Sequence, residues 1–161
     1  ALSAISELSI EGLAELRAFT QTLDEGEGRV TWPIFISELR RYGGQLIESH
    51  GKRFSLTANV KGEGRPSSAL CLTVLRIFRE ALTNVVKHAG AARVDVEVQV
   101  SAEEVTLSIS DDGAGGGEGG GLDTGRGVAN MKARARELGG ELSVVRGSGT
   151  RLSLRLPLGS R

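Results

Sequence analysis

The sequence is short of several residue types, and each shortage excludes a class of protein. It has a single cysteine, Cys71, so no disulfide can form within the chain. The whole chain has two histidines and one cysteine, which are too few to favour a zinc site. No apolar stretch reaches the ~18 residues of a membrane span, and no signal peptide is visible. The 20 basic and 20 acidic residues cancel, which argues against a chain whose main task is nucleic-acid binding.

What is present is typical of a soluble globular protein, with 39% hydrophobic and 25% charged residues among 161. That length is enough for one domain and a short appendage. An apolar stripe predicts an amphipathic helix over residues 2–23, and a polar, Gly-containing break follows at 24–29. We therefore expect two units, residues 1–24 and a domain over residues 30–158.

Within the larger unit, helical and alternating patterns are mixed. Trp32-Pro33 predicts the start of a helix that ends near residues 49–51, and Ser67-Ser68 predicts the cap of a long helix to about His88. A further helix is expected over 127–138. Alternation predicts strands at 54–60, 94–100, 105–109, 142–144 and 152–156. This order favours a two-layer α/β sandwich with a mixed sheet over a purely parallel α/β sheet.

The first chemically informative cluster lies near the end of the long helix. Glu80, Asn84, Lys87 and His88 fall at helical spacing and share one polar face in an α-helix. Such a face is also what a solvated helix shows. A carboxylate, an amide oxygen suited to Mg²⁺ and a cation suited to phosphate would equally serve a metal-bound polyphosphate.

Two glycine clusters follow. Asp111 comes directly after an apolar strand, and Gly113 and Gly115 let a ligand approach the backbone closely, although the same pattern occurs in plain turns. Gly125 and Gly127 open the helix expected at 127–138, where free N–H groups make an anion site. Neither a Walker P-loop nor the dinucleotide fingerprint is present.

Together these clusters resemble the ATP-binding domain of the GHKL superfamily, which has the Bergerat fold. The N box is Glu80-x-x-x-Asn84-x-x-Lys87-His88-Ala89, and the first glycine box is Asp111-x-Gly113-x-Gly115. The second glycine box is Gly125-x-Gly127-Val128-x-x-Met131, and Gly149-Thr150 is the closing motif. The resemblance covers about residues 33–158 and implies a mixed, mostly antiparallel sheet packed on three helices.

The resemblance also implies roles. Asp111 would receive the adenine amino group and Thr150 would line the base pocket. Asn84 would bind Mg²⁺ together with the phosphates of ATP, and Glu80 would act on that metal or its water as the catalytic residue. The remaining ATP-binding residues would be Lys87, His88, Gly113, Gly115, Gly125, Gly127 and Val128.

Within the superfamily the sequence is most similar to the histidine kinases of the nitrate-sensor and thermosensor subclass. Lys-His-Ala closes the N box, the lid is short, and Met-x-x-Arg-x-x-x-Leu-Gly-Gly runs over 131–140. Residues 1–24 look like the end of that subclass's helical dimerisation domain. The phosphoacceptor histidine of the family lies upstream of that helix, so we expect a piece of a longer kinase without its acceptor.

The implied function is transfer of the γ-phosphoryl of ATP to that absent histidine. The implied partners are ATP, the dimerisation domain with its histidine, a response regulator and a second copy in the full protein, with no direct nucleic-acid contact. A cytoplasmic domain is expected, whether the parent is membrane-anchored or soluble. The alternatives are another GHKL ATPase, of the gyrase, mismatch-repair or chaperone type, and a degenerate module that only senses nucleotide. A dinucleotide-binding domain is disfavoured.

Overall fold

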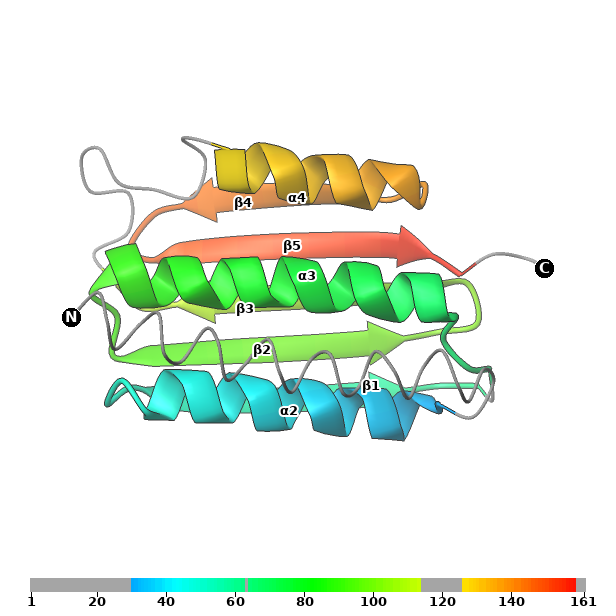
Figure 1. Ribbon diagram of the computed structural model, residues 1–161, viewed down its shortest axis with the longest axis horizontal. Helices are drawn as coiled ribbons and strands as arrows, with labels where there is room; N and C mark the ends of the chain where they lie inside the picture. The colour runs from blue at the N-terminus through cyan, green and yellow to red at the C-terminus, as the bar shows by residue number, and fades with distance from the viewer. Residues whose placement is uncertain (1–29, 63, 114–125, 159–161) are drawn as a thin grey trace.

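The computed structural model describes residues 30–62, 64–113 and 126–158, without the side chains of His88, Ala89 and Arg126. Its strands form one sheet with α-helices on one face (Figure 1). The elements in chain order are α2 (Trp32–Glu48), β1 (Arg53–Val60), α3 (Ser68–Asn84), η1 (Val85–Ala89), β2 (Arg93–Val100), β3 (Glu104–Asp111), α4 (Arg126–Glu137), β4 (Glu141–Arg146) and β5 (Thr150–Pro157). The helix predicted at 2–23, the boundary of the unit 1–24, and Gly115 and Gly125 lie outside the described residues.

The sheet has five strands in the order β1-β2-β3-β5-β4. β1 and β2 pair in parallel, with α3 as the crossover between them. The other three pairs are antiparallel. The expectation of a mixed, mostly antiparallel sheet is therefore confirmed.

The three α-helices form the second layer, with α3 between α2 and α4 (Figure 1). α2 begins where expected, because the Thr31 side chain accepts a hydrogen bond from the Ile34 amide at 3.3 Å and proline occupies the first turn. α3 begins at its predicted cap, where Ser67 Oγ accepts from the Leu70 amide at 3.1 Å. Among the described helices, none is long and apolar enough to cross a bilayer.

The core lies between the two layers and follows from strand alternation. In β2, every second residue from Val94 to Val100 is buried, and in β3 the buried residues run from Val105 to Asp111. Their partners from α3 include Phe78 and Leu82, both with no exposed surface. Asp111 is thus the last position of an otherwise apolar stripe, and the strand carries its carboxylate to the edge of the core.

The long helix differs from the prediction in its last turn. The α-helical pattern ends at Asn84, and Val85–Ala89 form a π-helix, closed by Gly90 at φ 61°. A π-helical turn is wider than an α-helical one because its hydrogen bonds join residues five apart. The α-helical spacing that aligns Lys87 and His88 with Glu80 therefore holds only as far as Asn84. Val85 is buried, whereas Val86 is half-buried.

The turn between α4 and β4 explains the Leu-Gly-Gly end of the subclass motif. Gly139 has φ 79°, a conformation that favours glycine after a helix end. The Gly140 amide donates to the Ala135 carbonyl at 2.9 Å. A Cβ on Gly140 would come within 2.1 Å of the Arg155 carbonyl oxygen. Glycine at both positions thus lets the chain turn back tightly against β5.

Candidate nucleotide site

Glu80 and Asn84 occupy successive turns near the end of α3, and both are half-buried. Lys87, on η1, is exposed. The His88 side chain lies outside the described residues. α3 thus carries the polar face predicted from the sequence, with a carboxylate and an amide one helical turn apart.

The start of α4 lies directly against that face. A Cβ built on Gly127 would come within 2.6 Å of Glu80 Oε2 and 3.6 Å of Asn84 Nδ2. Only a residue without a side chain fits there while Glu80 keeps its position. The second glycine box and the N box, far apart in the sequence, therefore meet at one place in the fold.

Asp111 forms the floor beside this junction. It is 9% exposed, and its Oδ1 accepts a hydrogen bond from the Gly113 amide at 2.8 Å. Burial raises the pKa of its carboxyl, an effect that hydrogen bonds from the Gly113 and Thr150 backbones oppose. The negative charge of Asp112 also raises this pKa, and the positive charge of Lys52 lowers it. A buried carboxylate of this kind suits a ligand that donates a hydrogen bond to it.

The Gly-Thr motif completes the site from β5. Thr150 is the register partner of Asp111 across the β3–β5 pair, so the two residues are neighbours on one sheet face. A Cβ on Gly149 would lie 2.0 Å from the Asp111 carbonyl oxygen, so the chain passes too close to Asp111 for any side chain.

Comparison with known proteins agrees with this arrangement. Residues 72–160 match the family described as histidine kinase-, DNA gyrase B-, and HSP90-like ATPase. Sensor histidine kinase YxjM of Bacillus subtilis is 34% identical over 151 residues, which are 92% of this chain and 35% of YxjM. Sensor histidine kinase DesK of the same organism is 36% identical over 84 residues, which are 52% of this chain and 23% of DesK.

A solved structure shows the same fold. The histidine kinase domain of a blue-light activated histidine kinase from Erythrobacter litoralis superposes with a TM-score of 0.65 at 24% identity, covering 86% of this chain and 69% of that one. The chain belongs to the histidine kinase-, DNA gyrase B- and HSP90-like ATPase family. It carries the ATP-binding catalytic domain of a sensor histidine kinase. It spans about a third of the length of YxjM, 35%.

Two residues near Asp111 were not among those predicted from the sequence to belong to the site, Lys52 and Asp112. Lys52, between α2 and β1, donates to the Ala91 carbonyl and places a positive charge near Asp111. Asp112, the unspecified position of the first glycine box, accepts from the Ala92 and Arg93 amides at 2.8 and 2.9 Å. Nothing in their local sequence signals these contacts.

Val128, one of the predicted ATP-binding residues, lies in the core. Its side chain is 4% exposed and packs in the core with Met131 of the same helix. The side chain therefore anchors α4 to the domain, and its backbone amide in the first turn is the group left to face an anion.

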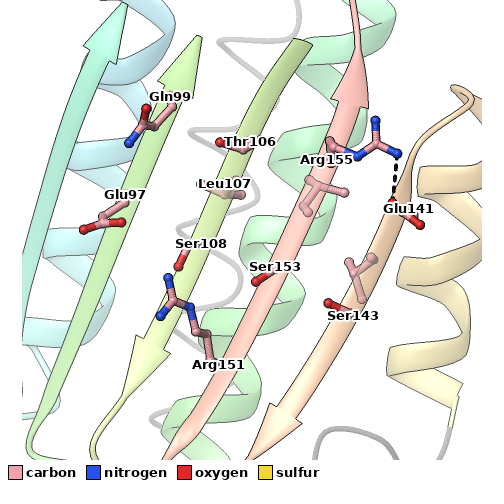
Figure 2. Close-up of a pocket in the computed structure, with 12 residues that line it drawn as sticks. Glu97, Gln99, Thr106, Leu107, Ser108, Glu141, Ser143, Arg151, Ser153 and Arg155 are labelled. Atoms are coloured by element: carbon pink, nitrogen blue, oxygen red, sulfur yellow. Dashed lines mark hydrogen bonds and ion pairs between the residues drawn. The ribbon is translucent and has the colours of Figure 1, made fainter.

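An open concavity of about 540 Å³ lies on the other face of the sheet, away from the helices (Figure 2). Small hydroxyl residues Ser108, Ser153 and Ser143 form its floor across three neighbouring strands, with an Arg155–Glu141 ion pair of 2.8 Å at one side. Its polar lining faces away from Asp111, so it is not part of the nucleotide site of the ATPase domain.

Two side chains beside Gly127, those of Glu80 and Asn84, are of types that can contribute ligands to a metal ion. Within the described residues, no group of three or more His, Cys, Asp or Glu side chains is arranged to hold a metal ion. Beside Gly127, the Glu80 carboxylate presents an oxygen, and the Asn84 side chain comes nearest through its amide nitrogen, Nδ2, with the amide oxygen on the same group. Carboxylate and amide oxygens are the type of donor that Mg²⁺ takes. This small number of protein ligands is what is expected for an ion whose other ligands are phosphate oxygens and water.

Proposed function

We propose that this domain binds Mg²⁺-ATP between α3 and the start of α4, and that the whole protein transfers the γ-phosphoryl to a histidine outside these 161 residues. The observation that carries the proposal is the close approach of Gly127 to Glu80 and Asn84. The buried Asp111 lies at the last position of β3. The proposed base acceptor lies on β3 and the proposed phosphate-binding residues lie on α3 and α4, which supports one nucleotide that spans them.

Each residue then has a task. The Asp111 carboxylate accepts the adenine amino group, and Gly113 and Thr150 hold that carboxylate in place. The Asn84 amide oxygen would be the protein ligand of Mg²⁺, and the Glu80 carboxylate would hold a metal-bound water. Lys87, Gly127 and Val128 serve the phosphates through a side chain or backbone amides, and the family resemblance assigns His88, Gly115 and Gly125 to ATP binding as well.

Catalysis would rest on position and charge rather than on covalent chemistry of the domain. Phosphoryl transfer needs the attacking and leaving groups in line and the developing charge neutralised. Bound Mg²⁺ supplies that neutralisation. The protein's own contribution is to hold the nucleotide at both ends and to exclude free rotation of the triphosphate.

We also propose, from the similarity to sensor histidine kinases, which partners the domain has and in which compartment it works. The named relatives are sensor histidine kinases, so we infer a dimer, an acceptor histidine on a helical domain and a response regulator downstream. Because ATP is supplied in the cytoplasm, we place the domain there. No direct contact with nucleic acid is part of this proposal.

Labelled ATP tests the proposal. The parent protein should gain acid-labile, base-stable label, and the 161-residue chain alone should gain none. Asn84→Ala should abolish labelling of the parent and the Mg²⁺-dependence of ATP binding, while circular dichroism stays native-like. Asn59→Ala, an exposed residue of β1, is the matched control and should label normally. Stoichiometric label on His50 or His88 of the short chain, or normal labelling in Asn84→Ala, would contradict it.

A further inference from the structure

The short loop of residues 90–92 joins the two ends of the proposed nucleotide site. It begins at Gly90, where η1 with Lys87 ends, and it leads into β2 at Arg93. β2 in turn runs beside β3, with Val94 opposite Asp111. Any displacement of this loop therefore shifts the phosphate end of the site relative to the base end.

The loop is held by side chains from two other segments. Asp112 Oδ1 accepts hydrogen bonds from the Ala92 and Arg93 amides at 2.8 and 2.9 Å. On the other side, Lys52 Nζ donates to the Ala91 carbonyl. The Arg53 amide adds a bond to the Ala92 carbonyl at 2.9 Å. Four consecutive backbone groups are thus fixed within three residues.

Asp112 is well suited to this task. Two successive amides point at one carboxylate oxygen, and hydrogen bonds of this charged kind are stronger than neutral ones. The same hydrogen bonds lower the pKa of the Asp112 carboxyl, because they favour the ionised form that accepts them. The side chain is exposed and is not part of the core.

We propose that Asp112 is a positioning residue that sets the distance between the base and phosphate ends of the ATP site by holding the amides of Ala92 and Arg93, where the loop of residues 90–92 enters β2. The inference rests on the proposed function. Asp111 is held independently by its pairing with Thr150 and by Gly113. Loss of the Asp112 carboxylate therefore loosens the η1 side of the site, where the bonds from Lys52 and Arg53 remain, and it leaves the base side in place.

The test compares a ligand that spans both ends with one that occupies only the base end. Asp112→Ala should weaken Mg²⁺-ATP binding about tenfold, because a small misplacement of a binding group has a large effect. Adenosine, titrated by NMR, should bind within about twofold of wild type, since its contacts are on the Asp111 side. Asp112→Asn keeps an acceptor oxygen for the two amides and should recover most of the Mg²⁺-ATP affinity.

Asp95→Ala is the matched control, because it removes an aspartate whose carboxylate contacts only the side chains of Ser55 and Arg93 in the contacts described, on the far sheet face. It should leave both affinities unchanged. If Asp112→Ala does not fold, Lys52→Met releases the same loop from the Ala91 side. It should weaken Mg²⁺-ATP more than adenosine, with a smaller loss for adenosine because Lys52 also lowers the pKa of Asp111.

Three results would overturn the inference: unchanged Mg²⁺-ATP affinity in Asp112→Ala, an equal loss for both ligands, or no recovery in Asp112→Asn. A wild-type chain that binds neither ligand would instead contradict the proposed function.

Discussion

At the scale of single residues, Asp111 shows a conflict between stability and binding. Its carboxylate is 9% exposed, and burial raises its pKa above the usual value of 3.8. The folded domain therefore holds this proton more tightly than the unfolded chain does. Stability is lost as the pH rises from the unfolded pKa through the higher folded pKa, and it returns as the pH falls. At neutral pH, the nucleotide-free domain carries the cost of a buried charge.

Asp111→Asn separates the two effects. Removing the charge should leave the melting temperature of the nucleotide-free domain equal or higher at pH 7, because the desolvation cost disappears. ATP affinity should fall by about 1.5–3 kcal/mol, roughly 10- to 100-fold, since a charge-assisted hydrogen bond to the base is lost. Thermal melts and calorimetry measure the two quantities. Asp95→Asn, on the other face, should change neither, and a large loss of stability in Asp111→Asn would show that the carboxylate is structural.

At the scale of elements, the start of α4 depends on the absence of a side chain at Gly127. The Cβ of Gly127→Ala would lie 2.6 Å from Glu80 Oε2, the end of a flexible side chain that can move aside. Alanine is also a better helix former than glycine by about 1 kcal/mol. The domain should therefore fold as well or better.

The same change should damage the site. With the Glu80 carboxylate displaced, Mg²⁺-ATP affinity should fall roughly tenfold in calorimetry, through loss of a positioned group. Gly44→Ala on α2 is the control, because its Cβ would meet Phe54 only at an ordinary 3.8 Å. If Gly127→Ala binds Mg²⁺-ATP as tightly as the wild type does, the proposal that the nucleotide lies at the start of α4 is wrong.

Much of this element arrangement could be predicted from the sequence, for physical reasons. The alternation of Val94 to Val100 specifies a half-buried strand, and Ser67 caps α3 as its side chain dictates. The position of Asp111 at the end of an apolar strand could also be predicted, and its role as a ligand residue stays a prediction. These signals are local, and local signals determine secondary structure when the tertiary structure agrees with them.

The π-helix η1 and the hydrogen bonds that hold residues 90–92 could not be predicted. The pattern of Val85 and Val86 is compatible with an α-helix, and the wider turn depends on how Gly90 and the loop after it are held. Lys52 and Ala91 are 39 residues apart, and Asp112 and Ala92 are 20 apart. Such contacts arise only once the sheet has brought β1, β2 and β3 together.

At the scale of the whole molecule, one sheet covered on one side by helices places the described site residues at the same edge of the domain, where β3 ends and β5 begins. The floor comes from the end of β3 and the start of β5, and the wall comes from the ends of α3 and α4 nearest to them (Figure 1). The polar concavity on the opposite face is separate from this edge. The fold thus fixes the Asp111 carboxylate and the Asn84 amide, the proposed base acceptor and metal ligand, on a strand and a helix.

The central claim is that this edge binds adenine nucleotides through Asp111 and Asn84, and calorimetry of the chain with Mg²⁺-ATP and Mg²⁺-GTP tests it most directly. Adenine presents an amino group to the Asp111 carboxylate, whereas guanine presents a carbonyl oxygen there, which would leave two acceptors facing each other. The account predicts binding of ATP with an affinity at least about 100-fold above that of GTP. GTP binding as tight as ATP binding, or binding of neither, would contradict it.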